Sequence, residues 1–189
     1  MDKLWTILVL GRSVLDFYAY QAEEQVRKPM NTKKKRRVLF VDDMSERWEI
    51  FNELYRTPET SHVEFVWAKN YDEAVAQLPK GKWDVVFLDH DLEDPTEYNQ
   101  QSGWPDGTAI VDWIREHTPF IGNTICHSMN PVGRMRMVQI LQRGKYPARP
   151  VPFYSFDGFL LSLIADGDDS QIPQPEDIWE EEIGDLYGG

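Results

Sequence analysis

Two short apolar runs that end abruptly on carboxylates constrain this chain most. Residues 38–43 read Val-Leu-Phe-Val-Asp-Asp, and residues 84–92 read Asp-Val-Val-Phe-Leu-Asp-His-Asp-Leu. Apolar runs of this length are typical of strands buried on both faces in a parallel sheet. The carboxyl ends of neighbouring parallel strands meet at one edge of the sheet, where open α/β sheets bind ligands. We therefore expect Asp42, Asp43 and Asp89 to lie close together and to share a divalent cation, Mg²⁺ or Mn²⁺.

Strand and helix patterns alternate through the centre of the chain. Beyond these two runs, we expect strands at residues 63–68, 124–128 and 149–153, and helices at residues 45–56, 70–78, 107–117, 131–142 and 159–165. Ser45 and Asn70 are the expected caps of the first two helices, because their side chains can accept from free backbone amides. Alternation of this kind predicts an α/β fold with a doubly wound, five-stranded parallel sheet.

The two ends of the chain differ from its centre. Residues 4–20 are apolar at near-helical spacing, but Arg12 and Asp16 interrupt them, so we expect an amphipathic helix rather than a membrane span or signal peptide. Met30 offers an alternative translation start, and residues 33–37 form a basic run.

The predicted organisation has three parts. An amphipathic helix and basic linker occupy residues 1–36, an α/β domain occupies residues 37–154, and a short helix with an acidic tail occupies residues 155–189. The tail is expected to be loosely ordered. The amino-terminal helix and the tail are both candidate contacts for a protein partner.

Composition is that of a soluble globular protein, with 41% hydrophobic and 28% charged residues. The single cysteine, Cys126, excludes an intrachain disulfide and fits a buried thiol in a reducing cytoplasm. Residues 157–189 hold ten carboxylates and no Lys or Arg, so they account for ten of the twelve net negative charges. By contrast, residues 117–156 carry five cations and no carboxylate, which suits an anionic substrate.

The acid pair, Asp89 and the helix start Pro105-Asp106-Gly107 together resemble the receiver domain of two-component response regulators, over residues 37–153. The resemblance implies the strand order 2-1-3-4-5 and a Mg²⁺ site on the three aspartates. In a signalling receiver, it would also imply that Asp89 accepts a phosphoryl group.

Two departures separate this chain from ordinary receivers. Receivers usually carry a lysine where this chain has Val151, although Arg149, two residues earlier on the same strand face, is a candidate substitute. Histidines also stand near the strand ends, at His90 and His127, where receivers need only a hydroxyl. Either His127 or Ser128 occupies that hydroxyl position.

Residues 88–92, Leu-Asp-His-Asp-Leu, and residues 127–133, His-Ser-x-Asn-Pro-x-Gly, are similar to motifs of the cyclic-phosphate-processing receiver domains of bacteria and their viruses. That resemblance implies activity on cyclic phosphates, at RNA ends or in cyclic nucleotides.

Each step of such a reaction has candidate residues. His127 and His90 would serve as general base and acid, in an order left open, beside Asp89. Ser128, Asn130 and the amides that begin the following helix would donate to the phosphate. Arg134, Arg136 and Arg149 would add positive charge.

Three functions remain open: a metal-dependent phosphoesterase, a phosphoacceptor receiver, and a non-catalytic module that binds a nucleotide or partner. His90 has a structural alternative, a hydrogen bond to a backbone carbonyl. The segment 93–104 is a candidate lid in which Tyr98 and Trp104 either stack on a base or pack the loop.

Overall fold

The computed structural model describes residues 33–92 and 106–172. The chain divides into two compact units, Met1–Lys34 and Lys35–Gly189, and the architecture below is that of the second unit. The expected amino-terminal helix, the candidate lid at residues 93–104 and most of the acidic tail lie outside the described residues.

Five parallel strands form one sheet in the order β2-β1-β3-β4-β5. The strands are β1 (Arg36–Val41), β2 (Val63–Ala68), β3 (Trp83–Leu88), β4 (Ile121–Cys126) and β5 (Ala148–Pro150). This order confirms the predicted receiver-like sheet. It also places β1 and β3 side by side at the centre, so that the loops after them share one edge.

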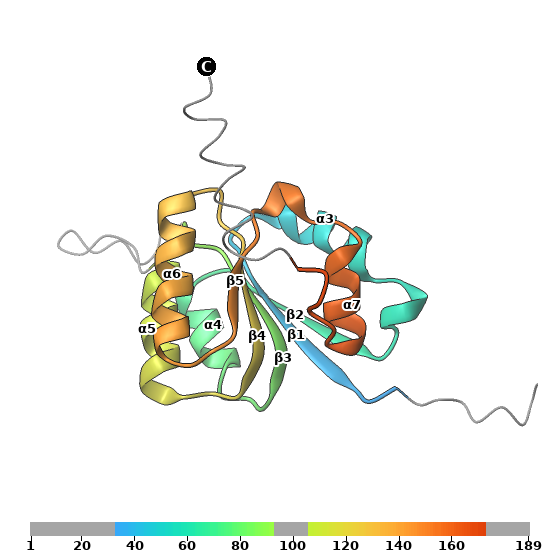
Figure 1. The fold of residues 1–189 in the computed structure, drawn as a ribbon, viewed down its shortest axis with the longest axis horizontal. Coiled ribbons are helices and arrows are strands. Elements are labelled where there is room, and N and C mark those ends of the chain that lie inside the picture. Colours follow the sequence, from blue (N-terminus) through green and yellow to red (C-terminus); the bar gives the residue numbers. More distant parts are fainter. Residues whose placement is uncertain (1–32, 93–105, 173–189) are drawn as a thin grey trace, which may run out of the picture. The chain divides into compact units, whose positions relative to one another are not determined.

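Helices cover both faces of the sheet (Figure 1). They are α3 (Ser45–Tyr55), α4 (Tyr71–Gln77), α5 (Gly107–His117), α6 (Pro131–Arg143) and α7 (Phe159–Asp166), with short 3₁₀ turns η1 (Pro58–Thr60) and η2 (Phe153–Ser155). In Figure 1, α4, α5 and α6 lie on one side of the sheet, and α3 and α7 lie on the other.

Side-chain caps fix where several helices begin. Asn70, Asp106 and Asn130 each accept a hydrogen bond from the backbone amide three residues later, which satisfies a free amide of the first turn. The expected cap at Ser45 is wrong by one residue. Met44 is the N-cap of α3, and its amide donates to Asp42 Oδ1 at 2.8 Å. A carboxylate of the candidate metal cluster therefore also shapes the entry to α3.

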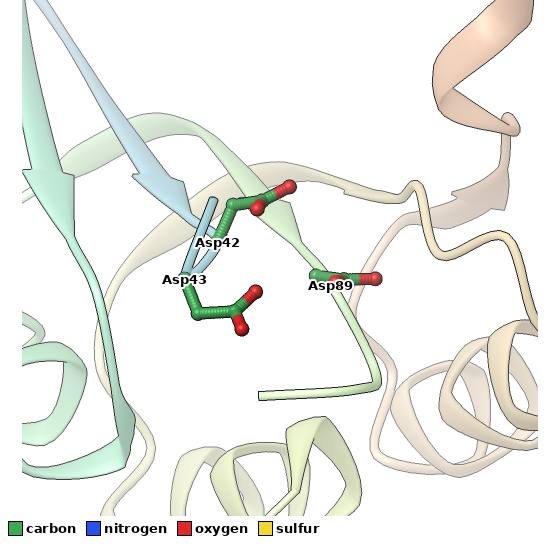
Figure 2. A group of neighbouring side chains, drawn as sticks. All are labelled: Asp42, Asp43 and Asp89. Carbon is green, nitrogen blue, oxygen red and sulfur yellow. The ribbon is translucent and has the colours of Figure 1, made fainter. Parts of the chain in front are cut away.

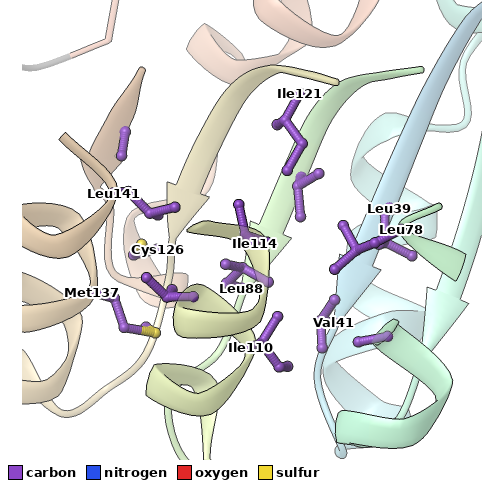
Figure 3. Close-up of a cluster of buried hydrophobic side chains, with 14 of the residues drawn as sticks. Leu39, Val41, Leu78, Leu88, Ile110, Ile114, Ile121, Cys126, Met137 and Leu141 are labelled. Carbon is purple, nitrogen blue, oxygen red and sulfur yellow. The ribbon is translucent and has the colours of Figure 1, made fainter. Parts of the chain in front are cut away.

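The two faces of the sheet carry different cores. Aliphatic side chains from the sheet and from α4, α5 and α6 form one cluster, part of which Figure 3 draws, including Leu39, Leu88 and Ile114. The opposite cluster, under α3 and α7, is rich in aromatic rings and contains Phe40 and Phe87. Alternate residues of each buried strand thus supply alternate cores.

The last two strands differ from their sequence-based limits. β4 covers Ile121–Cys126 rather than residues 124–128, because the chain turns after His127 toward α6. β5 ends at Pro150, and the expected strand residues 151–153 lead instead into η2. Backbone contacts to the preceding strand nevertheless continue, because the amides of Val151 and Phe153 donate to the backbone oxygens of Cys126 and His127.

The basic run at residues 33–37 has two parts: its three lysines are exposed, and its two arginines begin β1. Arg36 donates to the backbone oxygens of Leu163 and Ile164 at the end of α7, and Arg37 pairs with Glu64 and covers the ring of Trp83. These two arginines therefore stabilise the domain. Within the described residues, no helix is both long enough and apolar enough to cross a bilayer.

Candidate active site

The register of the central strands brings the three predicted carboxylates together. Val41 pairs with Leu88, and the amide of Asp89 donates to Val41 O at 2.9 Å, so Asp42 and Asp89 leave neighbouring strands at the same level. One ligand oxygen from each of Asp42, Asp43 and Asp89 lies within 4.8 Å of the other two. Figure 2 shows these side chains at the ends of β1 and β3.

The chemistry of this donor set suits a hard divalent cation. Asp42 is fully buried, Asp89 is 1% exposed and Asp43 is partly buried, so their negative charges have little water to screen them. Carboxylate oxygens are the ligands that Mg²⁺ and Mn²⁺ prefer. The residues present therefore fit the cation that the sequence predicted.

Arg47, which the sequence interpretation missed, reaches into this cluster from the first turn of α3. Its Nη1 lies 2.9 Å from Asp89 Oδ2 and 3.0 Å from Asp42 Oδ2, so one nitrogen bridges two buried carboxylates. Burial by itself would lower the pKa of Arg47, but the charges of Asp42 and Asp89 outweigh it and raise that pKa. The guanidinium is thus firmly cationic and neutralises part of the cluster.

His127 is the innermost member of the site. Its amide donates to Leu88 O, which extends the sheet by one residue and places His127, rather than Ser128, beside Asp89. Its Nε2 donates to Asp42 Oδ2 at 3.0 Å. The imidazole is fully buried, and among the described residues its Nδ1 has no hydrogen-bond partner.

Four phenylalanine rings surround that imidazole, and we call them the aromatic cage. Phe40 stacks on it at a centroid distance of 4.9 Å with an interplanar angle of 16°. The other three rings approach it at centroid distances of 5.7 to 6.4 Å, and they belong to Phe87, Phe153 and Phe156. The aromatic cage thus surrounds the imidazole of His127, which is hydrogen-bonded to Asp42.

His90 lies at the surface end of the same loop, in a different setting. Its side chain is 15% exposed and lies between two carboxylates, with Nδ1 2.7 Å from Asp91 Oδ1 and Nε2 3.4 Å from Asp106 Oδ2. Asp91 and Asp106 are themselves 57% and 44% exposed. His90 is therefore held in place yet remains within reach of solvent and ligand.

The loop between β4 and α6 supports His90 through Asp91. Ser128 Oγ donates to Asp91 Oδ2 at 3.3 Å and accepts from the amide of Asn130 at 3.0 Å. Arg134 is buried, and its Nη1 donates to the backbone oxygen of Ser128. Asn130 Oδ1 accepts from the amide of Gly133 as the cap of α6. The structure thus links residues predicted to bind substrate into a support for the Asp91–His90 pair.

Two glycines permit the close packing of this support. A Cβ on Gly133 would lie 2.5 Å from ring carbons of His90, and a Cβ on Gly107 would lie 2.2 Å from the backbone oxygen of Asp89. No real Cβ approaches other atoms so closely. Gly107 and Gly133 must therefore be glycines, because the residues that follow β3 pack directly against them.

The remaining predicted residues lie in different settings. Arg136 is exposed on α6. Arg149 pairs with Ile125 in the sheet, two residues before the level of His127, and its guanidinium lies 3.4 Å from Asp169. Val151 is buried in the aromatic core. The ion pair with Asp169 links Arg149 to the segment after α7.

The sequence pattern did not mark Arg47 as a residue of the site. A charged residue in the first turn of an amphipathic helix usually faces water. One signal was available: side chains of a helix lean toward its amino-terminal end, so a first-turn residue after a strand can reach back to that strand's end.

Comparison with solved structures returned receiver domains. A CheY-like response regulator receiver domain protein from Methanospirillum hungatei is 14% identical, covers 80% of this chain and 93% of its own, and has a TM-score of 0.46. The response regulator TrrA from Thermotoga maritima, in complex with Mg²⁺-BeF, is 20% identical over 62% of this chain and 85% of its own, with a TM-score of 0.45. The receiver domain of HemR from Leptospira biflexa is 21% identical over 62% and 82%, with a TM-score of 0.44.

Comparison with curated proteins gave no match. The family model described as "Cyclic-phosphate processing Receiver domain" matches residues 37–143, more than half of the chain. That range includes the three clustered aspartates, both histidines and the support formed by Ser128, Asn130 and Arg134. The chain belongs to the family of cyclic-phosphate processing receiver domains.

Proposed function

We propose that this domain is a phosphoesterase that depends on a divalent cation and opens a cyclic phosphate, either at an RNA end or in a cyclic nucleotide. The observation that carries the proposal is the pairing of two sites at one edge of the sheet. Three carboxylates lie within 4.8 Å of one another, and the adjoining residue, His90, is held by Asp91 at 2.7 Å with its other nitrogen near the surface.

Opening a cyclic phosphate by hydrolysis forms one P–O bond from water and breaks one ester P–O bond. The attacking water loses a proton, the departing alkoxide gains one, and the product is a phosphate monoester. When bound at Asp42, Asp43 and Asp89, Mg²⁺ or Mn²⁺ would neutralise charge on the phosphate and polarise its P–O bonds. The protein's own residues must then move the protons.

His90 is the residue that we assign to proton transfer. Asp91 accepts from Nδ1 and thereby fixes the ring. Nε2, which lies 3.4 Å from Asp106 Oδ2, is the nitrogen that we assign to proton exchange with water or alkoxide. Ser128 and Arg134 act through Asp91, because they hold the loop that positions it. The exposed Arg136 and the first amides of α6 supply positive potential for an approaching phosphate.

His127 receives a different role from the general acid or base expected from the sequence. Its burial in the aromatic cage and its hydrogen bond to Asp42 suit a positioning residue, which orients one carboxylate oxygen of the cluster. The same carboxylate accepts from the amide of Met44 through its other oxygen. Asp42 is therefore held at both oxygens before any cation arrives.

The test is a screen by phosphorus NMR of a 2′,3′-cyclic nucleotide, a 3′,5′-cyclic nucleotide and an oligoribonucleotide with a cyclic phosphate end. With Mg²⁺ or Mn²⁺ the wild-type protein should convert at least one of them to a monoester, and a chelator should stop the conversion. Asp89→Asn should abolish turnover, whereas Asp112→Asn, on an exposed surface of α5, should retain it. Equal turnover by Asp89→Asn and the wild type would refute the proposal.

Phosphoacceptor signalling is the second candidate, because Asp89 ends β3 within a receiver fold that matches the family model. Incubation with acetyl phosphate and Mg²⁺ would then add one acid-labile phosphoryl group to Asp89, seen as a mass increase. Such labelling without turnover of any cyclic phosphate would favour this candidate. Tight nucleotide binding with neither result would favour a binding module. We propose a cytoplasmic location for the protein under all three candidate functions, which agrees with the free thiol of Cys126.

A further inference from the structure

Arg47 contacts two of the three carboxylates that would bind a divalent cation. Its Nη1 lies within 3.0 Å of one oxygen of Asp42 and of one oxygen of Asp89. The side chain is 19% exposed, so it lies at the boundary between the cluster and solvent. The ring of Phe153 lies 5.9 Å from the guanidinium carbon. Arg47 therefore places a positive charge within the cluster of three carboxylates.

A divalent cation and this guanidinium compete for the same oxygens. Asp42 Oδ2 already accepts from His127, and Asp42 Oδ1 accepts from Met44, so Asp42 has little room for another donor. Two cations held a few ångströms apart in a buried site also repel each other strongly. Coordination of an ion by Asp42 and Asp89 must therefore weaken or break the contacts of Arg47.

Once released from the carboxylates, the positive charge of Arg47 would be available to bind the phosphate of a substrate. A phosphate in this pocket gains no charge from Val151, which is buried in the aromatic core. An arginine forms short, charge-assisted pairs with phosphate oxygens as well as with carboxylates. Its position at the edge of the pocket gives Arg47 access to a ligand that approaches from solvent.

We propose that Arg47 exchanges partners: a divalent cation displaces its guanidinium from Asp42 and Asp89, and the released side chain binds the substrate phosphate. This exchange rests on the cation site of the proposed function. It makes Arg47 a substrate-binding residue that is available only when the cation is present. It also makes cation binding and phosphate binding cooperative.

The first test is calorimetric titration of Mn²⁺ into the folded domain. Arg47→Met removes the competitor and should tighten Mn²⁺ binding on the order of tenfold, since a hydrogen bond to a charged group contributes that much. Arg56→Met removes one exposed charge from the end of the same helix, where Arg56 contacts Asn52 and the rings of Trp48 and Phe65, and should leave the affinity unchanged. Equal tightening by both variants would overturn the exchange, because net charge would then explain it.

The second test uses inorganic phosphate as the probe, added to the Mn²⁺-loaded protein and followed by tryptophan fluorescence. Trp67 Nε1 donates to the backbone oxygen of Asp42 at 2.7 Å, so an indole reports directly on the site. Arg47→Met should weaken phosphate binding on the order of tenfold, and Arg56→Met should not. Unchanged phosphate affinity in Arg47→Met would overturn the exchange.

A second variant keeps the test decisive if Arg47→Met fails to fold. Arg47→Lys retains the charge but cannot bridge two carboxylates with the same planar group, so it should bind Mn²⁺ more tightly than the wild type. A Mn²⁺ affinity of Arg47→Lys equal to that of the wild type would refute the exchange alone. Absence of Mn²⁺ binding in the wild type and in every variant would refute the proposed function together with it.

Discussion

Two histidines of this domain, His127 and His90, lie near the carboxylate cluster and differ in burial and in contacts. His127 is fully buried, stacked on Phe40 and bonded to a buried carboxylate. His90 is partly exposed and lies between Asp91 and Asp106, which are both open to solvent. The contrast shows that two histidines close to one carboxylate cluster can differ in their access to solvent, and the proposed function gives them different roles for that reason.

The two cores beneath the histidines explain this difference. On the α3 and α7 side, large aromatic rings rise to the level of the strand ends and close around His127. On the other side, Gly107 and Gly133 let α5 and α6 pack directly against Asp89 and His90, and the His90 side chain stays 15% exposed. Aromatic rings therefore enclose His127 completely, whereas His90 keeps some contact with solvent.

The largest effect is expected from His90→Gln, which keeps a polar side chain but removes the proton-transferring nitrogen. Turnover of a cyclic phosphate should fall about 10²- to 10⁴-fold, the usual contribution of general acid–base catalysis. Single-turnover assays with saturating Mn²⁺ would measure it. Retention of more than half the wild-type rate would remove His90 from the mechanism and break the contrast between the histidines.

His127→Ala should act on stability. The substitution empties the aromatic cage and leaves Asp42 without one donor, so the free energy of unfolding should fall by about 3 kcal/mol. His90→Ala, at a partly exposed position, should cost about 1 kcal/mol. Urea unfolding of both variants in chelator compares them directly, and equal losses would mean that the burial contrast has no energetic consequence.

Gly133→Ala tests whether the packing of α6 positions His90. The added Cβ would lie 2.5 Å from the imidazole carbons, so the ring must shift, and turnover should fall about tenfold. Stability should change little, because alanine favours the helix by about 0.5–1 kcal/mol and offsets part of the clash. Gly158→Ala, which meets nothing within 4 Å, is the matched control. A fully active Gly133→Ala would show that the ring position is not critical.

The smallest effect concerns Cys126, one residue before His127. Burial raises the pKa of its thiol, although the nearby charge of Arg134 opposes this, so the thiol stays protonated through the neutral and mildly alkaline range. Iodoacetamide at pH 8 should label it slowly in the native domain and readily in urea. Fast labelling of the native protein would indicate that this level of the sheet opens to solvent.

The sequence determined the fold more completely than the site. Buried strands are predictable because they are uninterrupted apolar runs. The helix Gly107–His117 was predicted at its observed limits, and Asp106 caps its start. The limits of β4 and β5 were misplaced by one to three residues, since they depend on pairing with the neighbouring strands rather than on local composition.

The carboxylate cluster was predictable because parallel strands bring their ends together. The partners of those carboxylates were not predictable, since they depend on side-chain directions in space. Arg47 reaches the cluster from the first turn of α3, and Arg149 pairs with Asp169 in the segment after α7. The burial of His127 could not be inferred either, because it requires Phe153 and Phe156, which are distant in sequence, to close over the strand end.

The most direct measurement is a Mn²⁺ titration of the wild-type domain and of Asp43→Asn, followed by electron paramagnetic resonance of the free ion. Asp43 is the most accessible of the three clustered carboxylates, so its replacement should leave the fold intact. One saturable site in the wild type, weakened at least about tenfold in Asp43→Asn, is the result expected if the three aspartates share an ion. No saturable binding, or binding equal in the two proteins, would contradict it.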